Sequence, residues 1–357
     1  MFFHKKNYHI NQIVSNYNSS IKKRRCNFDS KGKKLIRDQT LKSWINENLE
    51  ENIDYELASS DASFRRYFRL NYNNRSYIIM DAPPDKEPLT SYIDITEILL
   101  ENNLRVPQIY KIDKKNGFLL LEDFGQKPLL SVLKGSNYDE YYNAAIKTVI
   151  KLQKINQNNN LKEYSKKILK HEMALFDEWY LLKNKEILLS EEDMKGLNKT
   201  LEIIAESNIS QPFFFVHRDF HSRNLMLLND NELGMLDFQD AVVGPITYDL
   251  VSLLKDAYIE LDEEFIIDKV VRYWERACME GLLQKSDFSD FFQQFEIMGV
   301  QRHLKILGIF SRLSLRDGKH NYLNDIPLVE KYLLNVCERY SVLAPLRKIL
   351  RRAIHEH

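Results

Sequence analysis

The stretch that decides the fold of this chain is His217-Arg218-Asp219-Phe220-His221-Ser222-Arg223-Asn224, together with Leu236-Asp237-Phe238 that follows it. An apolar run at 213–216 precedes the stretch and predicts a short strand that delivers Asp219 into a loop. Apolar segments at 225–228 and 233–236 flank a polar turn and predict a hairpin that returns Asp237 to this loop. The side chains of Asp219, Asn224 and Asp237 are therefore expected to lie close together.

These residue types suit phosphoryl transfer. The reaction needs a carboxylate that orients an acceptor hydroxyl and takes up its proton, and we assign that role to Asp219. Magnesium takes oxygen ligands, which Asn224 and Asp237 can supply, and His217 is expected to support the loop. The spacing resembles the kinase catalytic loop H-x-D-x-x-x-x-N and its D-F-G aspartate, although Gln239 stands in place of the glycine.

The segment after Asp237 makes the resemblance more specific. Gly244-Pro245-Ile246-Thr247-Tyr248-Asp249-Leu250 resembles the G-P-x-x-Y-D-L pattern of the aminoglycoside phosphotransferase family. The resemblance implies a bilobal, protein-kinase-like fold of the α+β class, with a small mixed-sheet N-terminal lobe and a larger helical C-terminal lobe. It also implies that Asp249 braces the catalytic loop, and a plain role at the start of a helix is the alternative.

Three further stretches are similar to a narrower group, the anomeric N-acetylmuramate/N-acetylglucosamine kinases. These stretches lie at 60–69, 80–87 and 301–310, and they extend the resemblance from about residue 37 to about residue 345. The group implies ATP-dependent phosphorylation of the anomeric hydroxyl of these sugars in peptidoglycan recycling. Two alternatives remain open: a kinase for another alcohol or amino sugar, and an inactive kinase-like binding protein.

Charge divides the chain into unequal parts, although the formal net charge of its 357 residues is zero. Residues 1–37 carry a net charge of +9 and the remainder carries −9. We interpret residues 1–34 as a disordered basic arm, either a solvated tail or sequence upstream of the true start, and expect neither nucleic-acid nor membrane binding. Three separated cysteines and the lack of a long apolar run predict a soluble cytoplasmic protein of unknown oligomeric state.

The resemblance implies a nucleotide-binding lobe with a hinge at residues 35–125, and a catalytic and substrate-binding lobe at 126–357. Hydrophobic periodicity predicts the helices and strands of each lobe. In the first we expect a helix at 35–51, strands at 64–72, 76–80, 108–111 and 117–122, and a helix at 91–103. In the second we expect helices at 137–157, 163–188, 190–207, 248–259, 262–280, 287–313 and 325–354.

The nucleotide site departs from the usual kinase pattern. No G-x-G-x-x-G precedes the first hairpin; small residues, among them Ser60 and Ser63, stand there instead and leave backbone N–H groups open to phosphate. Met80 falls where a phosphate-binding lysine is usual, so the charge of Arg65, Arg66 or Lys86 is expected to replace it. The resemblance places Glu122 and Phe124 in the hinge beside adenine.

The acceptor site is assigned only in outline. A sugar that carries a carboxylate would be recognised by a basic group, and we name Arg302, Lys305 and Arg312 as candidates. The small-molecule partners predicted are therefore ATP and an amino sugar, with Mg²⁺ as the cofactor.

Overall fold

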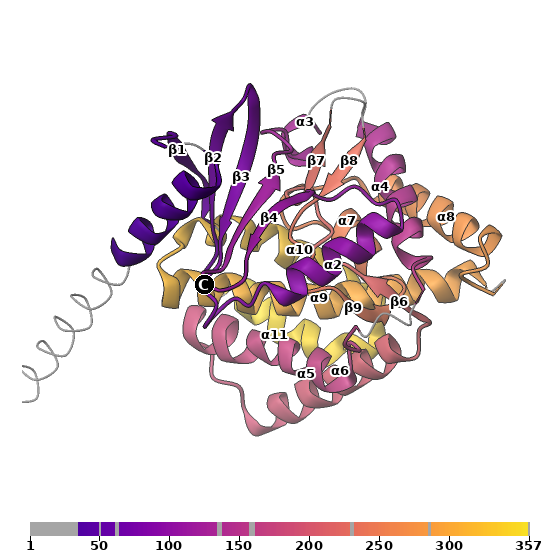
Figure 1. Cartoon of the computed structure of the whole chain (residues 1–357). Helices are drawn as coiled ribbons and strands as arrows, with labels where there is room; N and C mark the ends of the chain where they lie inside the picture. Colours follow the sequence, from indigo (N-terminus) through magenta and orange to yellow (C-terminus); the bar gives the residue numbers. More distant parts are fainter. Residues whose placement is uncertain are drawn as a thin grey trace, which may run out of the picture. The chain divides into compact units, whose positions relative to one another are not determined.

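The computed structural model describes residues 35–49, 51–60, 64–133, 138–156, 161–228, 232–284 and 287–355. The predicted basic arm, residues 1–34, and Ser63 lie outside these ranges. Contacts group the chain into two compact units (Figure 1). The first unit contains the chain up to Pro88 and Ile109–Glu122, and the second contains Leu89–Gln108 and Asp123–His357. The lobe boundaries predicted above remain a prediction.

The first unit is built on a five-stranded sheet in the order β1-β2-β3-β5-β4 (Figure 1). Every neighbouring pair is antiparallel, so the sheet is not the mixed sheet that we expected. Four strands match predicted segments: β2 (Arg66–Tyr72), β3 (Arg75–Asp81), β4 (Ile109–Asp113) and β5 (Phe118–Glu122). The edge strand β1 (Tyr55–Ser60) had not been predicted, because its residues lack a sustained apolar alternation.

The turn between β2 and β3 behaves as its asparagines suggest. Tyr72 pairs with Arg75, so the loop consists of Asn73 and Asn74 alone. Both have positive φ values, 48° and 58°, as a two-residue hairpin turn requires. Asparagine tolerates this conformation better than most residues do, which explains why the predicted turn forms here.

A helix over residues 35–48 covers this sheet and ends slightly before the predicted boundary at 51. Leu41, Trp44 and Ile45 are buried, in one apolar cluster with Ile79 and Phe118 of the sheet. Burial of these side chains is the main source of stability within the unit. The unit also buries one charged side chain among its described residues. This is Asp81 at the end of β3, which pairs with Arg37 of the helix and with Arg66 of β2.

The turn before β5 requires glycine. Gly117 has a φ of 75°, and a Cβ atom there would lie 1.9 Å from the carbonyl oxygen of Ala82. The chains are this close because Ala82 N donates a hydrogen bond to Gly117 O at 2.9 Å. Any side chain at 117 would have to break this contact.

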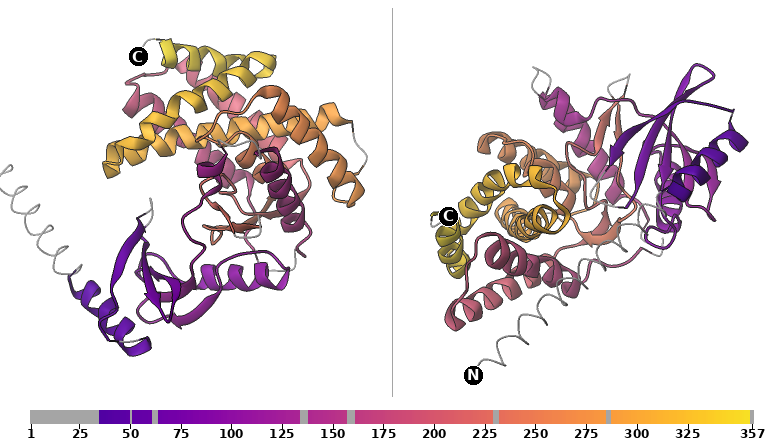
Figure 2. Two further views of the ribbon diagram at one scale, coloured as in Figure 1. Left: turned by 90° about the horizontal axis from the view of Figure 1, so that it is seen from above. Right: turned by 90° about the vertical axis from the view of Figure 1, so that its left-hand side faces the viewer.

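The second unit is mainly helical and is organised around α9 (Phe288–Asp317), which has 30 residues (Figure 2). It packs against α5 (Lys166–Leu175), α6 (Glu191–Ile209), α7 (Tyr248–Leu254), α8 (Glu263–Met279) and α10 (Ile326–Arg339). The remaining helices are α2 (Thr90–Glu101), α3 (Leu129–Val132), α4 (Tyr138–Gln153) and α11 (Ala344–His355). The short α3 had not been predicted, and α7 ends five residues before its predicted limit.

Two predicted helices are divided in the structure. The segment 163–188 forms α5 and then the π-helix η1 (Phe176–Asn184), and the segment 325–354 breaks at Tyr340 between α10 and α11. Close packing accompanies the first division, since a Cβ atom at Gly308 of α9 would lie 2.4 Å from the backbone carbon of Leu175. Hydrophobic periodicity cannot reveal such a change of helix type.

Two short ribbons of the second unit carry the predicted loop. β6 (Phe213–Val216) pairs with β9 (Val242–Pro245), and β7 (Leu225–Leu227) pairs with β8 (Leu233–Met235). β6, β7 and β8 confirm the predicted strand and hairpin, whereas β9 had not been predicted. In the described part of the chain, every helix is too short or too polar to cross a membrane.

Candidate active site

The predicted catalytic loop leaves β6 and is held by the start of α7. Asp249 accepts hydrogen bonds from the backbone N of His217 at 2.7 Å and of Arg218 at 3.0 Å. Burial raises the pKa of Asp249 to about 7, although the two backbone donors and Arg302 favour its charged form. His217 is fully buried, and burial lowers its pKa to about 4, so its imidazole is neutral at pH 7. Both side chains thus lie where support of the loop was expected.

Arg218 occupies a strained position next to Asp219. Its φ is 77°, in a left-handed region that costs a side-chain-bearing residue about 1–2 kcal/mol. Its carbonyl oxygen accepts from Arg302 Nη1 at 3.0 Å and from Ser252 Oγ at 3.3 Å. Its guanidinium pairs with Glu172 Oε1 at 2.5 Å. The surrounding helices therefore hold this residue in a conformation that it would not adopt unaided.

Asp219 keeps its charge in a strongly cationic setting. Its side chain is 35% exposed, and Arg302 Nη1 lies 3.9 Å from its Oδ1. Burial alone would raise its pKa, but Lys305 and Arg302 outweigh that effect and hold the pKa at about 2. Asp219 is therefore ionised at neutral pH and can accept a hydrogen bond from an acceptor hydroxyl.

Asn224 and Asp237 are adjacent in the structure, as the hairpin predicted. Leu236 N donates to Asn224 O at 2.8 Å, which sets Asp237 directly beside Asn224. Asn224 donates its Nδ2 to Asp219 O at 3.0 Å, so its side-chain oxygen is the atom left to bind a cation. Among the described residues, no group of three or more His, Cys, Asp or Glu is placed to hold a metal ion. An amide oxygen and a carboxylate nevertheless fit magnesium, which commonly takes one or two protein ligands plus phosphates and water.

Several residues around the loop were missed by sequence reasoning. Glu172 of α5 is buried between Arg218 and Lys305, and Asp256 accepts from both the backbone N and the Oγ of Ser222, at 2.9 and 2.5 Å. Neither carboxylate belongs to the motif, and each lies more than 30 residues along the chain from the loop at 217–224. Only their burial distinguishes them from solvated surface charges.

The three basic candidates for the acceptor site separate in the structure. Arg302 and Lys305 are buried on α9 and face the loop, but Lys305 is also engaged with Glu172 at 3.4 Å and Tyr248 Oη at 3.1 Å. Arg312 lies ten residues further along the helix, about 15 Å at the usual rise. Its charged neighbours are Arg316, Asp317 and Glu178, so the structure does not bring it to Asp219.

The candidate ATP contacts divide between the two units. In the first, Ser60 ends β1, Glu122 ends β5, and Arg65 pairs with Glu87 at 2.7 Å. Arg66 is paired with Asp38 and Asp81, so its charge already stabilises the sheet.

Phe124 belongs to the second unit. A Cβ atom at Gly234 of β8 would lie 2.4 Å from its ring, and Arg105 lies 4.7 Å from the ring centroid on the same unit. Phe124 is therefore held in place by its own unit. Its predicted contact with adenine remains a prediction.

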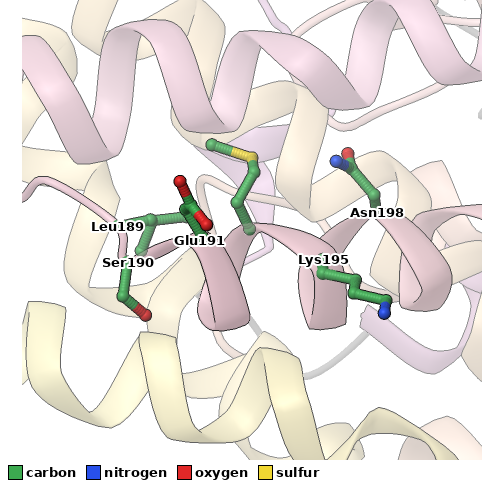
Figure 3. A pocket seen from close by; sticks show the side chains of 6 residues that line it. Leu189, Ser190, Glu191, Lys195 and Asn198 are labelled. Atoms are coloured by element: carbon green, nitrogen blue, oxygen red, sulfur yellow. The ribbon is translucent and has the colours of Figure 1, made fainter.

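A pocket of about 490 Å³ lies elsewhere on the second unit, at the start of α6 (Figure 3). It is lined by Leu189, Ser190, Glu191, Met194, Lys195 and Asn198. Because none of these residues belongs to the catalytic loop or touches it, we do not assign the reaction to this pocket.

Comparison with known sequences identifies the relatives of this chain. The phosphotransferase enzyme family matches residues 54–282. Similar proteins include the N-acetylmuramate/N-acetylglucosamine kinases of Neisseria meningitidis serogroup B and Pseudomonas aeruginosa, both 41% identical. The first alignment covers 88% of this chain and 96% of its relative, and the second covers 82% and 86%. The protein of that name from Pseudomonas putida is 36% identical.

Solved structures agree on the fold. An ADP-bound aminoglycoside phosphotransferase superposes with a TM-score of 0.56 at 16% identity, covering 86% of this chain and 97% of the other. A choline kinase from Streptococcus pneumoniae gives 0.60 at 13% identity, with 84% and 99% covered. The α+β kinase-like fold expected from the sequence is thereby confirmed. The chain belongs to the phosphotransferase enzyme family and is a kinase.

Proposed function

We propose that this kinase transfers the γ-phosphoryl group of ATP to the anomeric hydroxyl of N-acetylmuramate and N-acetylglucosamine. The names of relatives 36–41% identical over most of the chain carry this assignment. N-acetylmuramate is a peptidoglycan sugar, which supports a role in cell-wall recycling. The use of ATP supports the cytoplasmic location predicted from the sequence.

Asp219 is the proposed catalytic base. Its low pKa means that it holds the acceptor hydroxyl by a hydrogen bond and takes up the proton late in the reaction, as a loose phosphoryl-transfer transition state allows. Asn224 and Asp237 are the proposed ligands of Mg²⁺, which when bound neutralises phosphate charge. His217 and Asp249 support the loop and do not touch substrate.

The charge around Asp219 favours an anionic sugar over a polycationic aminoglycoside. Arg302 is only 4% exposed, its Nη1 lies 3.9 Å from Asp219, and its Nε has no hydrogen-bond partner among the described residues. A guanidinium beside the proposed base suits a carboxylate such as the lactyl group of N-acetylmuramate. A cationic acceptor would face Arg302 and Lys305 directly.

For ATP, we propose contacts from Ser60, Ser63, Arg65, Glu122 and Phe124, with Arg66 now the weaker candidate because Asp38 and Asp81 occupy it. Arg65→Ala is expected to raise the KM for ATP a few-fold. An unchanged KM would remove Arg65 from the site.

An acceptor panel tests the reaction. We expect ATP-dependent ADP release with N-acetylmuramate and N-acetylglucosamine, and a phosphate on C1 of the product by ³¹P and ¹H NMR. Their methyl glycosides, in which the anomeric oxygen is blocked, are the matched controls and should be inert. Phosphorylation of a methyl glycoside, or turnover with choline or an aminoglycoside but with neither sugar, would overturn the proposal.

A further inference from the structure

We propose that Glu172 is a positioning residue, which acts through Arg218 to hold the catalytic loop in its working conformation. The inference rests on the proposed role of Asp219 and extends it to a carboxylate on α5. Glu172 has no contact with Asp219 of its own among the interactions of the described residues, and of its two cationic partners, Arg218 and Lys305, Arg218 is the one that directly precedes Asp219 in the chain.

Both backbone polar groups of Arg218 and its Nη2 are held by neighbouring helices. Its backbone N donates to Asp249, and its carbonyl oxygen accepts from Ser252 and Arg302, so α7 and α9 fix its peptide groups. The contact from α5 is the pair between its Nη2 and Glu172 Oε1. Since Arg218 has a φ of 77° and immediately precedes Asp219, its side chain sets where the Asp219 carboxylate points.

Glu172 is itself firmly oriented. It is 8% exposed, and its Oε2 accepts from Tyr164 Oη and from Gln301 Nε2 at 3.3 Å. Its Oε1 also lies 3.4 Å from Lys305 Nζ. Although burial opposes its charge, Lys305 and Arg218 outweigh that effect and lower the pKa of Glu172. One carboxylate therefore separates two cations close to Asp219, the partly buried Arg218 and the buried Lys305.

This arrangement supplies the loop with an anion from within the chain. In kinases regulated by phosphorylation, a new phosphate pairs with arginine and orders the active segment. Here Glu172 provides the pairing charge permanently, which predicts a loop that is set without modification. Removal of that charge would leave Arg218 and Lys305 with no anion between them, and their repulsion would displace Arg218 from its left-handed conformation.

A second buried carboxylate offers a matched control. Glu330 of α10 is 7% exposed, accepts from Tyr180 Oη, and lies 3.3 Å from Lys185 Nζ. It resembles Glu172 in burial, in its tyrosine partner and in its cation, but it does not contact the catalytic loop. Loss of stability common to any buried carboxylate will appear in both variants, whereas a positioning effect will appear only at Glu172.

The experiment compares Glu172→Gln with Glu330→Gln in the full chain. We expect Glu172→Gln to lower kcat by about 10–100-fold, as a slight misplacement of a catalytic group does, while the KM for ATP stays within about two-fold. Hydrogen exchange at residues 217–224 should accelerate in this variant alone. Glu330→Gln should lower Tm and leave kcat and that exchange unchanged.

A double-mutant cycle then tests the path through Arg218. If Glu172 acts through Arg218, Glu172→Gln combined with Arg218→Met should be no slower than Arg218→Met alone. Multiplicative losses, or wild-type kcat and exchange in Glu172→Gln, would overturn the proposal. If Glu172→Gln does not fold, Arg218→Met decides alone, because wild-type kcat in that variant also excludes the mechanism.

The test of Glu172 can fail or succeed independently of the test of the proposed function. If the wild-type enzyme phosphorylates neither sugar, the acceptor assignment fails. The same cycle can then be measured with whichever acceptor the panel identifies, or with ATP hydrolysis. The positioning role would still be supported or rejected on those rates and on hydrogen exchange.

Discussion

The two units of this protein handle buried charge differently. Among the described residues of the first unit, Asp81 is the buried charged side chain, and Arg37 and Arg66 neutralise it at the end of a strand. In the second unit, Glu172, Asp249, Asp256, Arg302 and Lys305 are all buried around one loop. Burial of so much charge is costly unless each group is paired, and such clusters are typical of functional sites. The first unit is thus arranged mainly for packing, and the second concentrates reactive groups.

The largest effect is expected from the substitution that removes the proposed base, Asp219, from the charged cluster. Asp219→Asn should lower kcat by about 10²–10⁴-fold, the usual contribution of a general base, and should retain ATP binding. Steady-state rates together with ATP titration by calorimetry measure both. Near-normal turnover in this variant would exclude Asp219 as the base and with it the functional contrast between the units.

A smaller effect is expected from the pH dependence of Asp249. Because its pKa is about 7 in the folded chain instead of 3.8, the folded state binds its proton more tightly. Its contribution to stability is therefore full below about pH 4 and is lost as the pH rises through 7. Relative to Asp249→Asn, the wild-type free energy of unfolding should fall by about 3 kcal/mol between about pH 5 and pH 8.

Urea unfolding of the wild type and of Asp249→Asn at the two pH values checks this expectation. The difference between their free energies of unfolding cancels the titration of the other groups. A pH-independent difference would show that Asp249 is already ionised in the folded chain. The two backbone donors would then outweigh the effect of burial.

The smallest effects compare one tightly packed glycine from each unit. Gly117→Ala and Gly308→Ala should each destabilise the chain by about 1–3 kcal/mol, because a Cβ atom would overlap backbone atoms. Gly308→Ala should in addition lower kcat, since it separates α9 from α5 and hence Lys305 and Gln301 from Glu172. Gly117→Ala should leave the kcat of the folded enzyme unchanged.

Thermal unfolding and steady-state rates distinguish the two variants. Gly318→Ala is the control for Gly117→Ala, because Gly318 shares the positive φ of Gly117 but has open space around it. Equal effects on kcat from both tight glycines would contradict the difference that we draw between the units.

The fold was predictable from the sequence wherever neighbouring residues carried a clear local signal for a turn or a strand. The hairpin at Asn73 and Asn74 and the strand Phe213–Val216 were recognised because turn residues and apolar runs are local signals. β1 was missed because its residues lack apolar alternation, and β9 because it has only four residues and ends in Gly244 and Pro245. The division of α5 from η1 was missed because it depends on the approach of α9 at Gly308.

The sequence by itself determined the chemistry of the loop. Asp219, Asn224 and Asp237 are joined by a short strand, a loop and a hairpin, so their spacing along the chain is enough to bring them together. The tertiary structure decided which other charges act on them. Glu172 and Arg302 come from separate helices and Asp256 follows the end of α7, and a buried charge looks in sequence like a solvated one. Only packing reveals that Glu172 pairs with Arg218, or that Arg312 is too far along α9 to reach Asp219.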